Sequence, residues 1–295
     1  MTERILRETM TDKLQRFLFD DFEIRGEMAQ AHETFQQCID NHDYPEAVSN
    51  ILGELLVATS LLTATLKFEG RIAVQIQGDG PLSMAVINAN QSLEIRGTAR
   101  YEGNTAGLSF LQLVGKGTLM ITISPENGEP YQGIVALEKD SLAACLEDYF
   151  VQSEQLATKI SLFADSAKSP IQAAGLLLQA LPASNESHEE DFAHVCALAG
   201  TIKAEEIYTL KNEELLYRLY HEEQVRLFEE QSISFKCGCS QERCLSSLAS
   251  LAPSEITEIL EEQTSIDMRC EYCATTYSFK EQDLQILLTS ENQQH

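Results

Sequence analysis

Two pairs of closely spaced cysteines near the C-terminus constrain the fold of this chain more than any other feature. Cys237 and Cys239 form a C-x-C pair, and Cys270 and Cys273 form a C-x-x-C pair after an interval of 30 residues. Two thiol pairs joined by a helical excursion can bring four sulfurs to the corners of a tetrahedron, the arrangement of a structural zinc site with Zn–S distances of roughly 2.3 Å. A segment of about 60 residues has too small a core to fold readily alone, so a metal ion would stabilise it. The sequence therefore predicts one Zn²⁺ held by these four cysteines.

The spacing leaves three interpretations of this site open. The first is a static structural zinc knuckle, of the kind found in zinc-ribbon interaction modules. The second is a redox-sensitive site, because C-x-C thiols can close into a strained, easily broken disulfide and zinc holds cysteines as oxidisable thiolates. The third is a dithiol oxidoreductase motif at CEYC, although no βαβ unit is expected around it.

The other four cysteines are interpreted as packed side chains. Cys244 lies five residues after Cys239 in a predicted helix, ERCLSSLASL, with several leucines nearby. A packed thiol is the simplest interpretation of Cys244, and its rival roles are substitute ligand or resolving thiol. Cys38, Cys145 and Cys196 stand alone in helical contexts, where a free cysteine behaves as a small apolar residue.

Hydrophobic periodicity divides the chain into three parts and predicts an α+β fold. Residues 1–183 are expected to form a mixed sheet-and-helix domain with a largely antiparallel sheet. Its predicted elements are a helix from Ser49, strands at 71–77, 82–88, 92–101, 117–124, 131–138 and 155–164, a helix near 141–150 and an apolar helix at 169–181. Residues 184–231 are predicted to be a helical linker, whose narrow apolar stripes would detach easily. Residues 232–295 form the predicted zinc domain.

Composition and charge exclude several classes of function. The chain carries a formal charge of −25, and 43% of its residues are hydrophobic. An acidic surface without a basic cluster disfavours nucleic acid and anionic membrane as partners, and residues 232–295 alone carry ten acidic and four basic residues. The longest apolar run, residues 51–66, contains Glu54, so it is interpreted as a buried helix. The N-terminus has no apolar signal core, which predicts a cytoplasmic protein, and no nucleophile–base pair indicates an enzyme.

The cysteine spacing resembles that of the bacterial 33-kilodalton heat-shock protein family, the redox-regulated holdase chaperones. Blocks along nearly the whole chain are similar to that family and stand in its order: LLTATLKFEGRIAVQIQGDGPL, YFVQSEQLATKI, GLLLQALP, LLYRLYHEEQVRLF and CEYCATTYSF. Cys244 departs from the family pattern, in which an apolar residue is usual.

The resemblance implies both an architecture and a switch. The architecture is an N-terminal α/β domain, a metastable helical linker and a C-terminal zinc domain. Reduced protein would bind one zinc ion through Cys237, Cys239, Cys270 and Cys273 and be inactive. Hypochlorous acid, or peroxide with heat, would form the disulfides Cys237–Cys239 and Cys270–Cys273, with zinc release and unfolding of the zinc domain and linker. The opened protein would dimerise and hold unfolding client proteins without ATP. A thiol–disulfide oxidoreductase and a static zinc-ribbon module are the alternatives.

Overall fold

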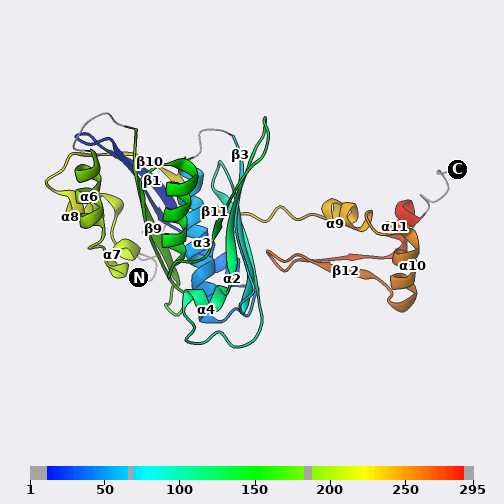
Figure 1. Cartoon of the computed structure of the whole chain (residues 1–295). Helices are drawn as coiled ribbons and strands as arrows, with labels where there is room; N and C mark the ends of the chain where they lie inside the picture. Colours follow the sequence, from blue (N-terminus) through cyan, green and yellow to red (C-terminus); the bar gives the residue numbers. More distant parts are fainter. Residues whose placement is uncertain (1–11, 66–68, 183–187, 289–295) are drawn as a thin grey trace, which may run out of the picture. The chain divides into compact units, whose positions relative to one another are not determined.

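The structure, a computed structural model, describes residues 12–65, 69–182 and 188–288. The chain forms two compact units, Met1–Lys236 and Cys237–His295, and each is described separately below. Figure 1 shows the sheets and helices of the first unit and the smaller second unit.

The first unit contains two sheets. One is five-stranded, with the order β10-β1-β2-β9-β8, and consists of β1 (Lys13–Phe19), β2 (Ile24–Gln30), β8 (Thr158–Asp165), β9 (Gln172–Ala180) and β10 (Val225–Ser232). The other is six-stranded, with the order β11-β5-β4-β3-β6-β7, and consists of β3 (Gly70–Gly78), β4 (Leu82–Asn90), β5 (Glu94–Tyr101), β6 (Gly117–Pro125), β7 (Tyr131–Ala136) and β11 (Ser234–Phe235). Every pairing is antiparallel except that of β11 with β5.

The predicted strands at 71–77, 82–88, 117–124 and 131–138 are confirmed, and they form two hairpins of the six-stranded sheet. The GDGP turn joins β3 to β4, which pair in the register Val74 with Ile87. Residues 126–130 join β6 to β7, and Gly128 has φ 141°, a conformation that favours glycine. The short helix predicted near residue 141 is also confirmed as α5 (Leu142–Tyr149), because the Ser141 side chain accepts the backbone N–H of Ala144 as its N-cap.

Helix α3 (Glu46–Thr65) forms the centre of the first unit. It contacts strands of both sheets, and 15 of its 20 residues are buried. Its length and composition would allow it to cross a membrane, but 83% of its most apolar window is buried inside the protein. The predicted helix from Ser49 is therefore present as a core helix that begins three residues earlier. The smaller helices α2 (His32–Ile39) and α4 (Phe110–Val114) and a π-helical turn at Phe150–Glu154 complete this part.

The predicted helix at residues 169–181 is wrong, because Gln172–Ala180 form strand β9. All nine residues of β9 are buried, since it lies between β2 and β8 with both faces covered. Ala173 and Leu177 pack into the core around α3, whereas Leu176 and Leu178 pack into a second apolar cluster on the other face. A strand covered on both faces is a continuous apolar run, which periodicity alone does not distinguish from a buried helix.

Three helices cover the outer face of the five-stranded sheet. They are α6 (His188–Ala199), α7 (Ala204–Thr209) and α8 (Asn212–Tyr220), and we call them the helical layer. Their buried side chains form the second apolar cluster with the strands beneath: Phe17, Phe19, Ile24, Met28, Ala174, Leu176, Leu178, Val195, Ala199, Ile207, Tyr208, Leu215, Leu216, Leu219 and Tyr220. The narrow apolar stripes of the predicted linker thus lie against the sheet.

The end of the predicted linker is a strand rather than a helix. β10 pairs with β1 from Lys13 opposite Ser232 to Phe19 opposite Val225. The chain then passes to the other sheet, where Ile233 is buried and β11 pairs with β5. The backbone N–H of Lys236 donates to the carbonyl of Ile95, and its ammonium forms an ion pair with Glu94. The residues just before Cys237 are therefore attached to the first unit.

The described part of the second unit, residues 237–288, contains three helices and one hairpin. These are α9 (Gln241–Leu248), α10 (Pro253–Glu262), β12 (Ile266–Arg269), β13 (Thr276–Phe279) and α11 (Glu281–Leu288). Among its described residues, five apolar side chains are buried together: Leu248, Ile256, Ile266, Phe279 and Leu284. A core of this size supplies little stability by itself, so the unit needs a further source of stabilisation.

Candidate metal centre

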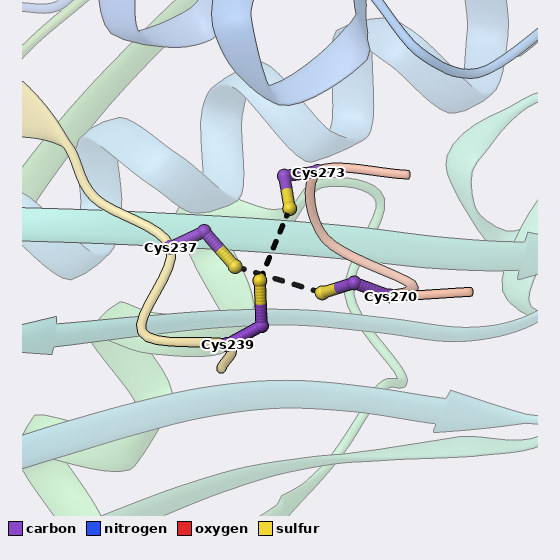
Figure 2. Close-up of side chains that lie close together, drawn as sticks. All are labelled: Cys237, Cys239, Cys270 and Cys273. Atoms are coloured by element: carbon purple, nitrogen blue, oxygen red, sulfur yellow. Dashed lines mark hydrogen bonds between the residues drawn. The ribbon is translucent and has the colours of Figure 1, made fainter. Parts of the chain in front are cut away.

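The four cysteines of the two sequence pairs meet in the second unit. Their sulfur atoms all lie within 4.8 Å of one another, and Figure 2 shows them converging from two separate loops. The Sγ atoms of Cys237 and Cys270 are 3.5 Å apart, and those of Cys239 and Cys273 are 3.4 Å apart. A tetrahedron with metal–sulfur distances of roughly 2.3 Å has sulfur–sulfur edges of about 3.8 Å. The cluster therefore has the dimensions of a four-thiolate metal site.

The C-x-C loop is fixed on both sides by local structure. Cys237 lies two residues after the end of β11, and Ser240 caps α9 by accepting the backbone N–H of Arg243. The guanidinium of Arg243 donates to the carbonyl of Gly238, at 2.6 Å, between the two cysteines. The loop is thus held so that both thiols point to the same side.

The C-x-x-C loop is the turn of the β12–β13 hairpin. Arg269 pairs with Thr276 at the end of the ladder. Beyond it, the N–H of Cys270 donates to the carbonyl of Thr275, and the N–H of Ala274 donates back to the carbonyl of Cys270. Ala274 has φ 55°, a left-handed conformation that tightens the turn. This geometry turns Cys270 and Cys273 toward the C-x-C loop.

The thiols differ in how readily they ionise. Burial first, and then the neighbouring thiols, raise the pKa of Cys237 to about 12, and burial also raises the pKa of Cys239. Burial acts in the same direction on Cys273, but hydrogen bonds from the side chain and backbone of Thr275 and from Cys239 lower its pKa to about 6. Four thiolates at this spacing repel one another, so a bound cation is needed to keep all four ionised.

Two hydroxyl groups contact the cluster. The Oη of Tyr277 lies 3.3 Å from the Sγ of Cys239, and the Oγ1 of Thr275 lies 3.2 Å from the Sγ of Cys273. The hydrogen bond with Cys239 raises the pKa of Tyr277 to about 12, so its hydroxyl stays protonated. Neither residue belongs to the cysteine pattern that predicts the site. Strand alternation from Phe279 back to Tyr277 and Thr275 could have indicated them, because side chains two apart share a face.

The remaining cysteines lie outside the four-sulfur cluster. Cys244 is half-buried and packs against the small core of the second unit. In the first unit, Cys38 and Cys145 are buried, and the half-buried Cys196 packs against the second apolar cluster. Burial raises the pKa values of these three thiols, to about 12 for Cys38 and about 11 for Cys196, which makes them poorly reactive at neutral pH.

These features define a class of protein, one with a sheet-and-helix unit followed by a small unit built around a four-cysteine metal centre. The family model described as Hsp33 protein matches residues 12–280. Proteins called 33 kDa chaperonin from Yersinia pestis (strain Pestoides F) and Yersinia pseudotuberculosis serotype O:1b (strain IP 31758) are 53% identical over 278 residues, which is 94% of this chain and 94% of theirs.

A solved structure has the same fold. The 33 kDa chaperonin (heat shock protein 33 homolog) of Thermotoga maritima aligns with a TM-score of 0.84 at 21% identity, over 95% of this chain and 98% of that one. The chain belongs to the Hsp33 family. This membership confirms the family resemblance drawn from the sequence.

Proposed function

We propose that this protein is a cytoplasmic, ATP-independent holdase chaperone that is inactive with zinc bound and is activated when the four clustered cysteines are oxidised. The observation that carries the proposal is the four-sulfur cluster in a unit with five buried apolar side chains. Membership of a family whose relatives are named chaperonins supports the holdase role. No step of this role requires catalysis by the protein.

The cysteine set fits zinc better than harder cations. Four sulfur donors without a carboxylate select soft or borderline metals, and a tetrahedral S₄ set is typical of zinc. Zinc supplies a redox-inert positive charge that keeps Cys237, Cys239, Cys270 and Cys273 ionised. Apparent zinc binding in small cysteine-rich domains is worth about 10–16 kcal/mol near neutral pH, whereas a whole domain is stable by about 5–15 kcal/mol. Loss of the metal would therefore unfold the second unit.

Oxidation would remove the ligands in two steps. A thiolate attacks a hydroperoxide, the O–O bond breaks, and the products are a cysteine sulfenic acid and an alkoxide or hydroxide. The neighbouring thiolate then attacks the sulfenic sulfur, forms the disulfide and displaces hydroxide. We assign the pairs as Cys237–Cys239 and Cys270–Cys273, because the two cysteines of each pair lie in one loop. Disulfides that close such short loops restrict the unfolded chain little, so they would not replace the stability that the metal supplied.

Client binding would require the helical layer to leave the five-stranded sheet. The layer is joined to the second unit by β10 and β11, and β11 ends at Phe235, two residues before Cys237. Unfolding of the residues after Cys237 would allow β11, and then β10, to detach from their neighbouring strands. The sheet face beneath includes Phe17, Phe19 and Met28, all buried under the layer. Its exposure would create an apolar surface for unfolded chains, and we expect the opened form to dimerise.

The decisive experiment compares the reduced and peroxide-treated protein. Light scattering should show that the oxidised form suppresses aggregation of a denatured client, that the reduced form does not, and that a thiol reductant reverses the change. Zinc release and disulfide mapping, measured in parallel, should follow activation. The Cys196→Ala variant is the matched control, because this thiol lies outside the four-sulfur cluster and alanine keeps the position apolar, and it should behave as the wild type.

Two outcomes would favour the alternatives. Catalytic reduction of insulin disulfides would indicate a thiol–disulfide oxidoreductase. Retention of zinc through oxidation, with no gain in client protection, would indicate a static zinc-ribbon module. Binding of nucleic acid or anionic vesicles is not expected from a chain with a net charge of −25.

A further inference from the structure

Each predicted disulfide pair contains one sulfur that contacts a hydroxyl group and one that does not. Cys239 contacts the hydroxyl of Tyr277, and Cys273 contacts the hydroxyl of Thr275. Among the described residues, Cys237 and Cys270 have no side-chain hydroxyl within hydrogen-bond distance: their sulfurs contact each other, and the Cys237 sulfur also accepts the backbone N–H of Cys239. The two halves of each pair are thus chemically different.

The two hydroxyls belong to a residue of strand β13 and to the residue just before that strand. Tyr277 lies on β13 and is half-buried, and Phe279, two residues further, is fully buried on the same face. Thr275 precedes β13 by one residue and has the same parity. Thr276 and Ser278 alternate with these positions and are exposed. Thr275 is itself exposed although its hydroxyl reaches the Cys273 sulfur, so Tyr277 is the half-buried member of the pair, and Thr276 and Ser278 face solvent.

In the metal-bound state the direction of these hydrogen bonds is fixed. As a thiol, Cys273 donates to the Oγ1 of Thr275. A coordinated cysteine is a thiolate, which has no proton to give, so in the metal-bound state Tyr277 and Thr275 must donate. A hydrogen bond to a thiolate withdraws electron density from the sulfur. It stabilises the thiolate as a ligand and lowers its reactivity toward an electrophile such as a peroxide.

We propose that Tyr277 and Thr275 are positioning residues that protect Cys239 and Cys273 and direct the first oxidation to Cys237 and Cys270. This inference rests on the proposed function, whose redox switch it deepens. A hydroperoxide oxidises the Cys237 or Cys270 thiolate to a sulfenic acid, with cleavage of the O–O bond. Cys239 or Cys273 then attacks that sulfur, displaces hydroxide and closes the disulfide. The two hydroxyls thereby set how much oxidant the centre tolerates.

The test removes each hydroxyl with little change of shape, in the full-length zinc-loaded protein. Tyr277→Phe and Thr275→Val are the test variants, and Thr276→Val and Ser278→Ala are matched controls from the exposed row of the same strand. The first readout is the rate of zinc release in peroxide, followed with a colorimetric chelator. Loss of one hydrogen bond to a charged group should accelerate release about 10- to 100-fold. The control variants should release zinc at the wild-type rate.

Two further readouts separate a hydrogen bond from a general loosening of the fold. Zinc affinity without oxidant should fall about tenfold in Tyr277→Phe, as is usual when a partner of a metal ligand is removed. In the Co²⁺-substituted protein, the thiolate-to-cobalt charge-transfer band should move to longer wavelength, because the sulfur becomes a better electron donor. Sulfenic acids trapped with dimedone at substoichiometric peroxide should be found by fragment mass spectrometry on Cys237 and Cys270 in the wild type, and also on Cys239 in Tyr277→Phe.

The outcomes distinguish this inference from the proposed function. Unchanged release rate, affinity and cobalt spectrum in both test variants would overturn the role of the hydroxyls, as would wild-type adducts concentrated on Cys239 and Cys273. A wild type that keeps its zinc in peroxide would refute the redox switch, whereas a lower zinc affinity in Tyr277→Phe would still support the hydrogen bond. A wild type that binds no zinc would overturn both.

Discussion

Tyr220 offers a test of whether the helical layer must leave the sheet before clients can bind. Its side chain is 2% exposed, and its ring packs edge-to-face against Phe19 with the centroids 4.9 Å apart. Its hydroxyl donates to the carbonyl of Val195, so it also ties α8 to α6. Replacing a buried aromatic residue by alanine costs about 3–5 kcal/mol. If these contacts are lost in the opened state, Tyr220→Ala should raise the opening equilibrium roughly 10²- to 10³-fold.

The assay uses reduced, zinc-loaded protein without oxidant. We expect Tyr220→Ala to suppress client aggregation in this form, where the wild type does not, while it still binds one zinc per chain. Limited trypsin digestion should cut faster within the helical layer, at Lys203, Lys211 and Arg218. The matched control is Tyr217→Ala, because Tyr217 lies on the same helix but is 71% exposed. Tyr220→Phe keeps the ring, so its client protection and its rate of trypsin digestion should lie between those of the control and those of Tyr220→Ala.

Two results would refute the reasoning behind this prediction. Normal resistance to trypsin in Tyr220→Ala would mean that the Phe19 and Val195 contacts do not hold the layer on the sheet. Faster digestion without client protection would mean that the face beneath the layer is not the surface that binds clients.

Four other perturbations have definite expected outcomes. Burial raises the pKa of Glu27 to about 7 from an ordinary value of 4.5, so its contribution to stability is present below pH 4.5 and is lost as the pH rises through 7. Urea unfolding should therefore show that the free energy of unfolding of Glu27→Gln, relative to that of the wild type, is about 2–3 kcal/mol higher at pH 8 than at pH 5. The same pH dependence in both proteins would contradict this. Removing the metal from reduced protein with a strong chelator should abolish amide-exchange protection in residues 237–288 and leave β3–β6 protected. Gly26→Ala should lower the thermal stability of the first unit by about 1–3 kcal/mol, because a Cβ there would overlap the Phe17 ring. Cys244→Ala should retain the wild-type zinc stoichiometry, and a loss of metal would identify Cys244 as a ligand.

The sequence predicted those features that depend on local patterns. The alternation of residues 71–77 and 82–88 identified β3 and β4, and the cysteine spacing identified the four sulfurs that the structure brings together. The strand signal comes from residues that are close in sequence. The metal-site signal comes from paired cysteines, a residue type with few other uses. The division of the chain at residues 183 and 231 and the identity of the metal remain predictions.

The features that the sequence analysis missed depend on distant parts of the chain. β9 was taken for a helix because the cover on its second face comes from the helical layer, which follows it in the sequence. β10 is mostly exposed and polar, and it is a strand because β1, more than 200 residues earlier, offers an unpaired edge. Tyr277 was missed because its role depends on the position of Cys239, 38 residues away.

Because both faces of β9 are covered, release of the helical layer would expose only one face of the five-stranded sheet. Alternate residues of this strand belong to two separate apolar clusters, and α3 lies in only one of them. Departure of the helical layer would strip one side of the sheet and leave the α3 side packed. The opened protein would then stay largely folded, with one exposed apolar face of the five-stranded sheet. Its recovery would require only that the three short helices pack again on a sheet that had remained folded.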